Sequence, residues 1–211
     1  MKKIIKRYKS LLKPLPLEGG PDLLVFRPLA FILVQVLKRF PVTPNQVSFS
    51  AIFTGLITAI FFALGTRRGF LIAGIFYGIT VTLDCADGML ARLKKSGTLM
   101  GRIIDGVVDY VNSFAIMFGL AIGTAKMHLA LPFGWSSWIW LSIAGFPMIL
   151  HCMVVDYYRN QFAIHGLGTK DPDFDETMEF ERLYKESIKN KGHFLERIVL
   201  WIATGYSRVQ K

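Results

Sequence analysis

The chain has 211 residues, of which 52% are hydrophobic and only 19% are charged. A composition this apolar excludes an ordinary water-soluble domain of the same size. Lys and Arg number 25 against 15 Asp and Glu, and a net charge of +10 on an apolar chain favours anionic lipid or phosphate partners over nucleic acid.

The first 42 residues are predicted to form a basic arm followed by a helix on the membrane surface. Residues 1–13 are rich in Lys, but prolines and glycines follow where a signal peptide would have its apolar run. Residues 25–40 are apolar but carry three basic side chains, so too few uncharged residues remain to cross about 30 Å of hydrocarbon. An amphipathic helix lying in the interface fits this pattern better than a span.

Four longer segments are apolar enough to form membrane-spanning helices of about 20 residues. They fall at about 46–65, 70–90, 98–124 and 134–157. The pattern predicts an all-α, polytopic membrane helical bundle, and we place its transmembrane core at 43–160. Thr43 and Pro44 suit the N-cap and the first turn of the first span.

Residues 161–211 are predicted to form a polar cytoplasmic loop and a C-terminal amphipathic helix. The apolar run within 193–211 is about ten residues long, roughly half of what a crossing requires. Basic residues set the orientation, because the arm, the Lys94-Lys95 loop and the loop 159–191 fall on one side of the membrane. We expect that side to be cytoplasmic in a multi-pass protein of the inner cell membrane.

Four carboxylates lie inside the predicted spans, where each ionisable side chain costs about 2.5–3.5 kcal/mol. Asp84 and Asp87 lie near the end of the second span, and Asp105 and Asp109 lie in the third. Spacings of three and four place each pair on one face of its helix. The short loop 93–97 predicts antiparallel neighbouring helices whose carboxylates face each other. Exposure to headgroup water would explain one or two of these residues, but not four.

Facing carboxylates repel one another unless a cation lies among them. Oxygen ligands select hard divalent ions such as Mg²⁺, Mn²⁺ or Ca²⁺, and we expect one or two Mg²⁺ or Mn²⁺ ions at these four Asp residues. Mg²⁺ commonly completes its coordination with phosphate, which predicts a phosphate-bearing substrate. A cation transporter and a metal-dependent membrane hydrolase are the competing interpretations. Transport sites lie near the bilayer midplane, whereas these carboxylates cluster toward one surface.

Small residues accompany the carboxylates. Gly88 and Ala91 continue the face of Asp84 and Asp87 and leave room for a flat ligand, and Arg92 supplies a guanidinium for phosphate. Three glycine pairs also fit the small-x-x-x-small pattern of helix contacts. They are Gly74 and Gly78, Gly97 and Gly101, and Gly119 and Gly123.

The carboxylate motif resembles the complete signature of the CDP-alcohol phosphotransferase family. It reads Asp84-x-x-Asp87-Gly88-x-x-Ala91-Arg92, then eight residues, then Gly101-x-x-x-Asp105-x-x-x-Asp109. Thr43-Pro44-Asn45 is similar to the segment that opens the first transmembrane helix of that family. The resemblance covers roughly residues 25–160.

This resemblance implies an enzyme of phospholipid biosynthesis that moves a substituted phosphate, such as a phosphatidyl group, from a CDP-alcohol to an acceptor alcohol and releases CMP. CDP-diacylglycerol is one such donor, and the family implies a homodimer in the lipid bilayer. Asp84, Asp87 and Asp105 would bind the metal, and Asp109 would share in that site and act as the general base. The nucleotide would be held by Asp84, Asp87, Gly88, Ala91, Arg92, Gly101 and Asn45.

The family has six spans, and the pattern here supplies only four. Either residues 25–40 and 193–211 cross the membrane after all, or the sequence stops before two further spans, which is the interpretation we prefer. Asp156 and Arg159 at the end of the fourth span, with Asn112, are candidates for the pocket of the acceptor alcohol, although Asn112 also suits an interhelical hydrogen bond. The identity of the acceptor stays open at this point.

Overall fold

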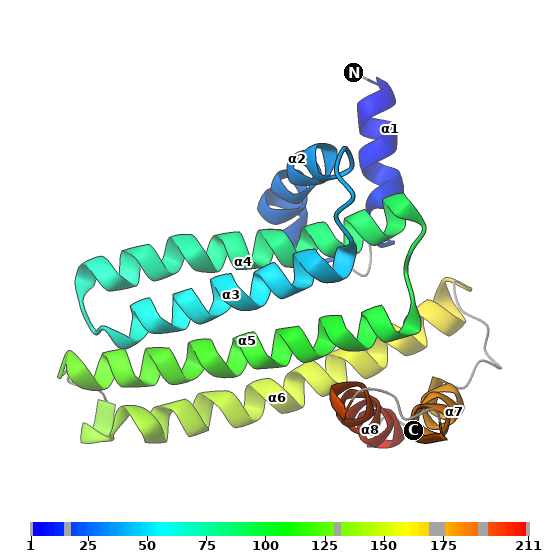
Figure 1. Ribbon diagram of the computed structural model, residues 1–211. Helices are drawn as coiled ribbons and strands as arrows, with labels where there is room; N and C mark the ends of the chain where they lie inside the picture. The colour runs from blue at the N-terminus through cyan, green and yellow to red at the C-terminus, as the bar shows by residue number, and fades with distance from the viewer. Residues whose placement is uncertain (1, 15–17, 129–131, 169–175, 190–193, 210–211) are drawn as a thin grey trace. The chain divides into compact units, whose positions relative to one another are not determined.

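The computed structural model describes residues 2–14, 18–128, 132–168, 176–189 and 194–209, and all regular structure in these ranges is helical (Figure 1). The long helices are α1 (Lys2–Leu11), α2 (Arg27–Leu37), α3 (Pro44–Ala63), α4 (Arg67–Lys94), α5 (Leu99–Lys126), α6 (Ser137–Gln161), α7 (Glu176–Lys189) and α8 (Phe194–Val209). A π-helical turn at Asp22–Phe26 leads into α2. The predicted all-α class is confirmed.

Four helices within the described ranges are long and apolar enough to cross a membrane, as predicted. The candidate spans are Pro44–Ala63, Arg67–Lys94, Ile103–Lys126 and Ser137–Arg159. The surface position predicted for α2 and α8 stays a prediction.

Threonine side chains begin the three helices of the core. Thr43 precedes Pro44 and forms a capping box with Gln46, as the Thr-Pro pattern predicted. Thr66 caps α4 by accepting from the backbone N–H of Gly69, and Thr98 caps α5 by accepting from that of Gly101, each at 3.0 Å. Each cap satisfies a backbone donor that has no partner within the helix. The caps therefore determine where along the chain each helix begins.

The described chain divides into two compact units, 1–142 and 143–211. In the first unit α3 packs along both α4 and α5, which run antiparallel to each other (Figure 1). The sequence predicted α4 and α5 as direct neighbours, but α3 makes most of the contacts with each of them. The helices α4 and α5 are joined by the short connection at 95–98 but, within the described residues, do not pack along their lengths.

Glycines on α5 explain the close contact with α3. A Cβ atom on Gly119 would collide with the backbone of Ala59, and one on Gly123 would collide with the carbonyl oxygen of Phe62. By contrast, a Cβ atom on Gly74 or Gly78 of α4 would meet no described atom within 4 Å. The predicted helix contact is thus present for the α5 pair and absent, within the described residues, for the α4 pair.

The third glycine pair fits the spacing but does not lie on one helix. Gly97 lies in the non-helical connection between α4 and α5, and a Cβ atom there would meet nothing within 4 Å among the residues that the structure describes. Gly101 lies in the first turn of α5, beside Thr98. The physical reason is the Thr98 cap, which begins the helix only after Gly97 and removes the pair from one continuous helix face.

The N-terminal helices share a hydrophobic core with the membrane helices. Leu11 of α1, Ala30 and Val34 of α2, and Val47 of α3 are buried together with four residues of α4. Those four are Cys85, Ala86, Met89 and Leu90. The N-terminal segment therefore packs against the part of α4 that carries the first two carboxylates of the motif.

The second unit contains an amphipathic pair of helices. In α7 and α8, Phe180 and Leu200 are buried, and Arg208 Nη2 pairs with Glu181 Oε1 at 2.6 Å. Trp201 and Ile202 of α8 stay exposed. The predicted C-terminal amphipathic helix over 193–211 is present as α8, which has 16 residues and is too short to be counted among the candidate spans.

Substitution of Gly123 by Ala is expected to destabilise the protein, because the added methyl group collides with the α3 backbone and such overpacking costs about 1–3 kcal/mol. Gly74→Ala is the matched control, since it adds the same methyl group to a membrane helix where nothing lies within 4 Å. Thermal unfolding in detergent measures both effects. Equal unfolding temperatures for the two variants would contradict the packing described here.

Candidate active site

Three carboxylates from two helices converge at one end of the first unit. Asp84 and Asp87 come from α4 and Asp105 comes from α5, and one oxygen of each lies within 4.8 Å of the other two. Asp87 is buried, and the other two are partly buried. Oδ1 of Asp105 is buried and has no hydrogen-bond partner among the described residues. A buried carboxylate oxygen without a donor is costly unless another group binds it.

This arrangement fits a hard divalent cation. Two oxygens bound to one ion at about 2.0–2.6 Å can be separated by at most about 4–5 Å, and the three carboxylates are close enough to share one ion. Carboxylate oxygens are also the ligands that Mg²⁺ and Mn²⁺ prefer. Asp84, Asp87 and Asp105 would hold such an ion.

Asp109 lies beside this group without completing it. It lies one turn of α5 beyond Asp105, and its carboxyl group is close to that of Asp84. Asp109 is more exposed than the other three. The structure therefore groups three of the four carboxylates, and the part of Asp109 in a metal site stays a prediction.

Ser48 of α3 holds the central carboxylate, and the sequence analysis did not single it out. Its Oγ donates to Oδ2 of Asp87 at 2.5 Å, and both residues are buried. A third helix thus supports the carboxylates of α4 and α5. The only signal in the sequence is a small polar residue one turn after Pro44, which is too common at a helix start to predict this contact.

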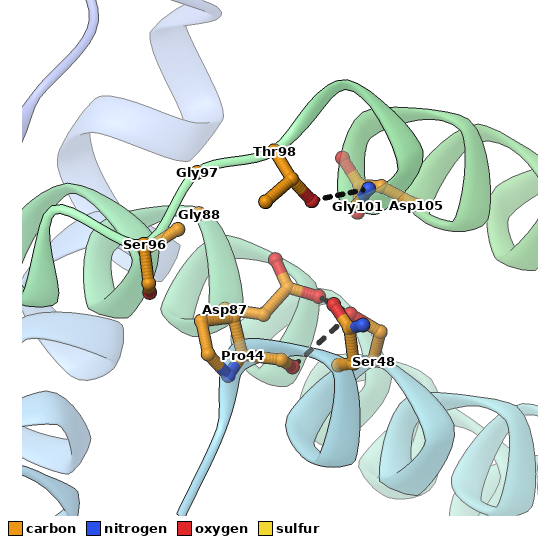
Figure 2. Close-up of a pocket in the computed structure, with 11 residues that line it drawn as sticks. Pro44, Ser48, Asp87, Gly88, Ser96, Gly97, Thr98, Gly101 and Asp105 are labelled. Atoms are coloured by element: carbon orange, nitrogen blue, oxygen red, sulfur yellow. Dashed lines mark hydrogen bonds between the residues drawn. The ribbon is translucent and has the colours of Figure 1, made fainter. Parts of the chain in front are cut away.

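A cavity opens beside Asp87 and Asp105, between α3, α4 and the start of α5 (Figure 2). It has about 410 Å³ of empty volume, part of which is open to solvent. It is lined by Pro44, Asn45, Ser48, Asp87, Gly88, Ala91, Ser96, Gly97, Thr98, Gly101 and Asp105. The structure thus gathers five residues that the resemblance assigned to the nucleotide: Asn45, Asp87, Gly88, Ala91 and Gly101.

Two glycines keep this cavity open. A Cβ atom on Gly88 would meet only the guanidinium of Arg92, at 3.8 and 4.0 Å, so the protein itself leaves space for a methyl group there. A Cβ atom on Gly101 would lie 3.1 Å from Oγ1 of Thr98 and 3.6 Å from Oδ1 of Asn45. The absence of a side chain at Gly88 thus leaves empty space within the site. The absence of a side chain at Gly101 leaves room for the side chain of Thr98 in the capping turn.

Arg92 lies next to the cavity but does not line it. Its Nε donates to the carbonyl oxygen of Leu11 at 2.6 Å, and its Nη2 is buried without a partner among the described residues. The guanidinium predicted to bind the nucleotide therefore also connects α4 to the end of α1.

The three acceptor-pocket candidates lie in different surroundings. Asn112 is buried on α5 and its Nδ2 donates to the carbonyl oxygen of Ala51 at 3.2 Å, which is the interhelical hydrogen bond considered above. Arg159 is exposed on α6 in the second unit, and the side chain of Asp156 lies outside the described residues. Their part in an acceptor pocket stays a prediction.

The match to a known family covers this whole site. A family model described as CDP-alcohol phosphatidyltransferase matches residues 41–170, more than half of the chain. The chain belongs to this family. The matched region contains every carboxylate of the motif and every residue that lines the cavity.

Curated relatives agree with this membership. The archaetidylinositol phosphate synthase of Pyrococcus horikoshii is 29% identical over 89 residues, 42% of this chain and 46% of the relative. A bifunctional IPC transferase and DIPP synthase of Thermococcus kodakarensis is 28% identical over 207 residues, 93% of this chain and 46% of the relative. A protein of the same name from Rubrobacter xylanophilus is 28% identical over 119 residues, 56% of this chain and 24% of the relative. The chain thus spans about half the length, or less, of these relatives.

Substitution of Gly88 by Ala is expected to weaken binding of a cytidine nucleotide at least tenfold without loss of stability. The methyl group meets no protein atom closer than 3.8 Å but occupies space in the cavity, and Ala is favoured over Gly inside a helix by about 1 kcal/mol. Gly106→Ala on α5 is the control, because that position also has open space and does not line the cavity. Calorimetric titration with CDP and thermal unfolding measure the two effects. Native CDP affinity in the Gly88 variant would contradict the assignment of this cavity.

Proposed function

We propose that this protein transfers a substituted phosphate group from a CDP-alcohol, such as CDP-diacylglycerol, to an acceptor alcohol and releases CMP. The observation that carries the proposal is the juxtaposition of Asp84, Asp87 and Asp105 with the cavity lined by Asn45, Gly88 and Gly101. In this reaction the acceptor oxygen forms a bond to the transferred phosphorus, the bond from that phosphorus to the CMP oxygen breaks, and the acceptor hydroxyl loses its proton.

The carboxylates divide this work. Asp84, Asp87 and Asp105 would hold one or two Mg²⁺ or Mn²⁺ ions, which would neutralise charge that develops on the departing CMP. Ser48 fixes the orientation of Asp87 through its hydroxyl group. Asp109 is the most exposed of the four and lies beside Asp84, so it would accept the proton of the acceptor hydroxyl.

The cavity would hold the cytidine nucleotide. Gly88 and Ala91 present one side of α4 without bulky side chains, so the nucleotide can lie close to the helix backbone. Asn45 and the first turn of α5 at Gly101 form the facing side. Arg92 borders Gly88, and its unpartnered Nη2 would donate to the pyrophosphate after a small rotation of the side chain.

We propose an inositol phosphate as the acceptor. The support is the name of the Pyrococcus relative, whose product is an inositol phosphate lipid. The other two relatives are named as bifunctional IPC transferases and DIPP synthases. Asp156, Arg159 and Asn112 are the proposed acceptor contacts, and Arg159 would supply a positive charge for the acceptor phosphate.

The family match supports this transferase over the cation transporter considered above. A hydrolase would use the same carboxylates with water in place of the alcohol. The carboxylates lie at one end of the helices, close to the connection at 95–98, and not at their centres. A water-soluble product such as CMP can leave from that position.

We also propose that the site faces the cytoplasm, at the inner membrane of the cell. Basic residues are concentrated at the same end of the first unit as the carboxylates, whereas Arg67, Arg68 and Lys126 lie at the other end. Homodimer formation is proposed by analogy with the family that the chain matches.

Purified protein with CDP-diacylglycerol and Mn²⁺ in detergent is expected to release CMP only when an acceptor alcohol is present. An acceptor series of inositol phosphate, inositol, glycerol phosphate, serine and water tests the proposal, with CMP and the lipid product measured by chromatography. Highest turnover with inositol phosphate is expected. CMP release in water alone would favour the hydrolase, and the absence of CMP release with every acceptor and with other CDP-alcohols would refute the transferase.

Asp109→Asn is expected to lower turnover at least 100-fold while CDP binding stays native, because an amide cannot accept the proton of the acceptor. CMP release and calorimetric CDP titration separate the two effects. Asp173→Asn is a control outside the motif. Near-native turnover of the Asp109 variant would show that another group is the base.

A further inference from the structure

The N-terminal segment contains a buried ion pair although it precedes the first membrane span. The side chains of Glu18 and Arg27 are 1% and 9% exposed, and Arg27 Nε donates to Glu18 Oε2 at 2.9 Å. Removing two charges from water is unfavourable and is offset only by good geometry and further hydrogen bonds. Both conditions are met here, since each partner makes an additional hydrogen bond.

The additional bond of Arg27 reaches the carboxylate helix. Its Nη1 donates to the backbone carbonyl oxygen of Cys85 at 3.3 Å, and Cys85 lies between Asp84 and Asp87. A carbonyl oxygen inside a helix has a second lone pair available for such a donor. Arg27 therefore contacts the α4 backbone at the turn that projects two of the three convergent carboxylates.

The additional bond of Glu18 leads to a second contact with α4. Glu18 Oε1 accepts from the backbone N–H of Lys13 at 2.8 Å, and the nearby carbonyl oxygen of Leu11 accepts from Arg92 Nε at 2.6 Å. Arg27 and Leu11 are thus hydrogen bonded to α4 at Cys85 and at Arg92, respectively. These two contacts bracket the segment that carries Asp87, Gly88 and Ala91.

We propose that Arg27, held in place by Glu18, is a positioning residue that fixes the carboxylate turn of α4 in the geometry needed to bind a divalent cation. The inference rests on the metal site of the proposed function. The segment before the first span would then hold the metal-binding carboxylates in place, in addition to any contact that it makes with lipid.

Positioning and charge have opposite effects on metal binding, which makes the role testable. The charge of Arg27 acts on both Asp84 and Asp105. A positive charge near the carboxylates repels a divalent cation, so its removal by itself would strengthen metal binding. Loss of positioning would instead weaken metal binding, because the carboxylate oxygens would no longer be held together.

The experiment measures Mn²⁺ binding to the purified, detergent-solubilised protein by electron paramagnetic resonance, without substrate. Arg27→Gln is expected to weaken Mn²⁺ binding about tenfold, within the range seen when groups that orient metal ligands are removed. Glutamine is too short to contact Glu18 and the Cys85 carbonyl together. Lys126→Gln is the matched control, because Lys126 Nζ also donates to a backbone carbonyl, that of Ala63, at the other end of the bundle. Native Mn²⁺ affinity is expected for this control.

Arg27→Gln leaves Glu18 as a buried, unpaired charge and is prone to misfold. The double variant Glu18→Gln with Arg27→Gln avoids this problem, since it removes both charges and keeps the net charge of the pair at zero. Because loss of the Arg27 charge by itself would strengthen Mn²⁺ binding, weaker binding in this variant reports lost geometry. Weaker Mn²⁺ binding in the double variant, with a native elution volume and helical circular dichroism, is the expected result.

Two outcomes would overturn the inference while leaving the metal site intact. Unchanged Mn²⁺ affinity in the double variant would make the pair a purely structural one, and tighter binding in the Arg27 variant would show an effect of charge only. If the wild-type protein binds no Mn²⁺ at all, the metal site of the proposed function fails and this inference fails with it. The wild-type titration therefore distinguishes the two failures.

Discussion

The mutual repulsion of Asp84, Asp87 and Asp105 is the constraint on which the site depends. Three carboxylates with oxygens within 4.8 Å of one another stay together only if the backbone holds them there and if a positive group is available to them. The surrounding structure meets both needs. Ser48 and the core around Cys85 immobilise the carboxylate turn of α4, and an oxygen of Asp105 is left free to bind a cation.

The close contact between α3 and α5 follows from this need for rigidity. Without bulky side chains at Gly119 and Gly123, the α5 backbone lies directly against α3, and α3 in turn packs along α4. Helices that associate in lipid gain little from the hydrophobic effect and depend on such packing. The two carboxylate-bearing helices are therefore held at a fixed separation by a third helix and not by the repelling residues themselves.

Much of the site was predictable because its signals are local. The apolar lengths predicted the four spans, the Thr-Pro pattern predicted the start of α3, and the spacing of the Asp residues predicted two facing stripes. The contacts of Ser48 with Asp87 and of Arg27 with Cys85 were not predictable, because each joins residues far apart in the chain. A buried Glu-Arg pair in a basic N-terminal segment looks, in sequence, like any other charged surface.

The packing of the helices also differed from expectation, because α3 and not α5 packs along α4. A connection of a few residues between two helices indicates that they are antiparallel, but it does not specify that they pack along their full lengths. The side chains along the helices decide that question, and the glycines of α5 favour α3. Proximity at the connection was enough to bring Asp105 to Asp84 and Asp87.

The Thr98 cap has a consequence for how this sequence tolerates insertions and deletions. Asp105 follows Thr98 by seven residues, two helical turns, so the cap and the carboxylate lie on nearly the same side of α5. One residue added between them would rotate Asp105 by about 100° around the helix axis and turn it away from α4. A residue added before Thr98 would lengthen the connection and change the wall of the cavity, but would leave the rotation of α5 relative to its cap unaltered.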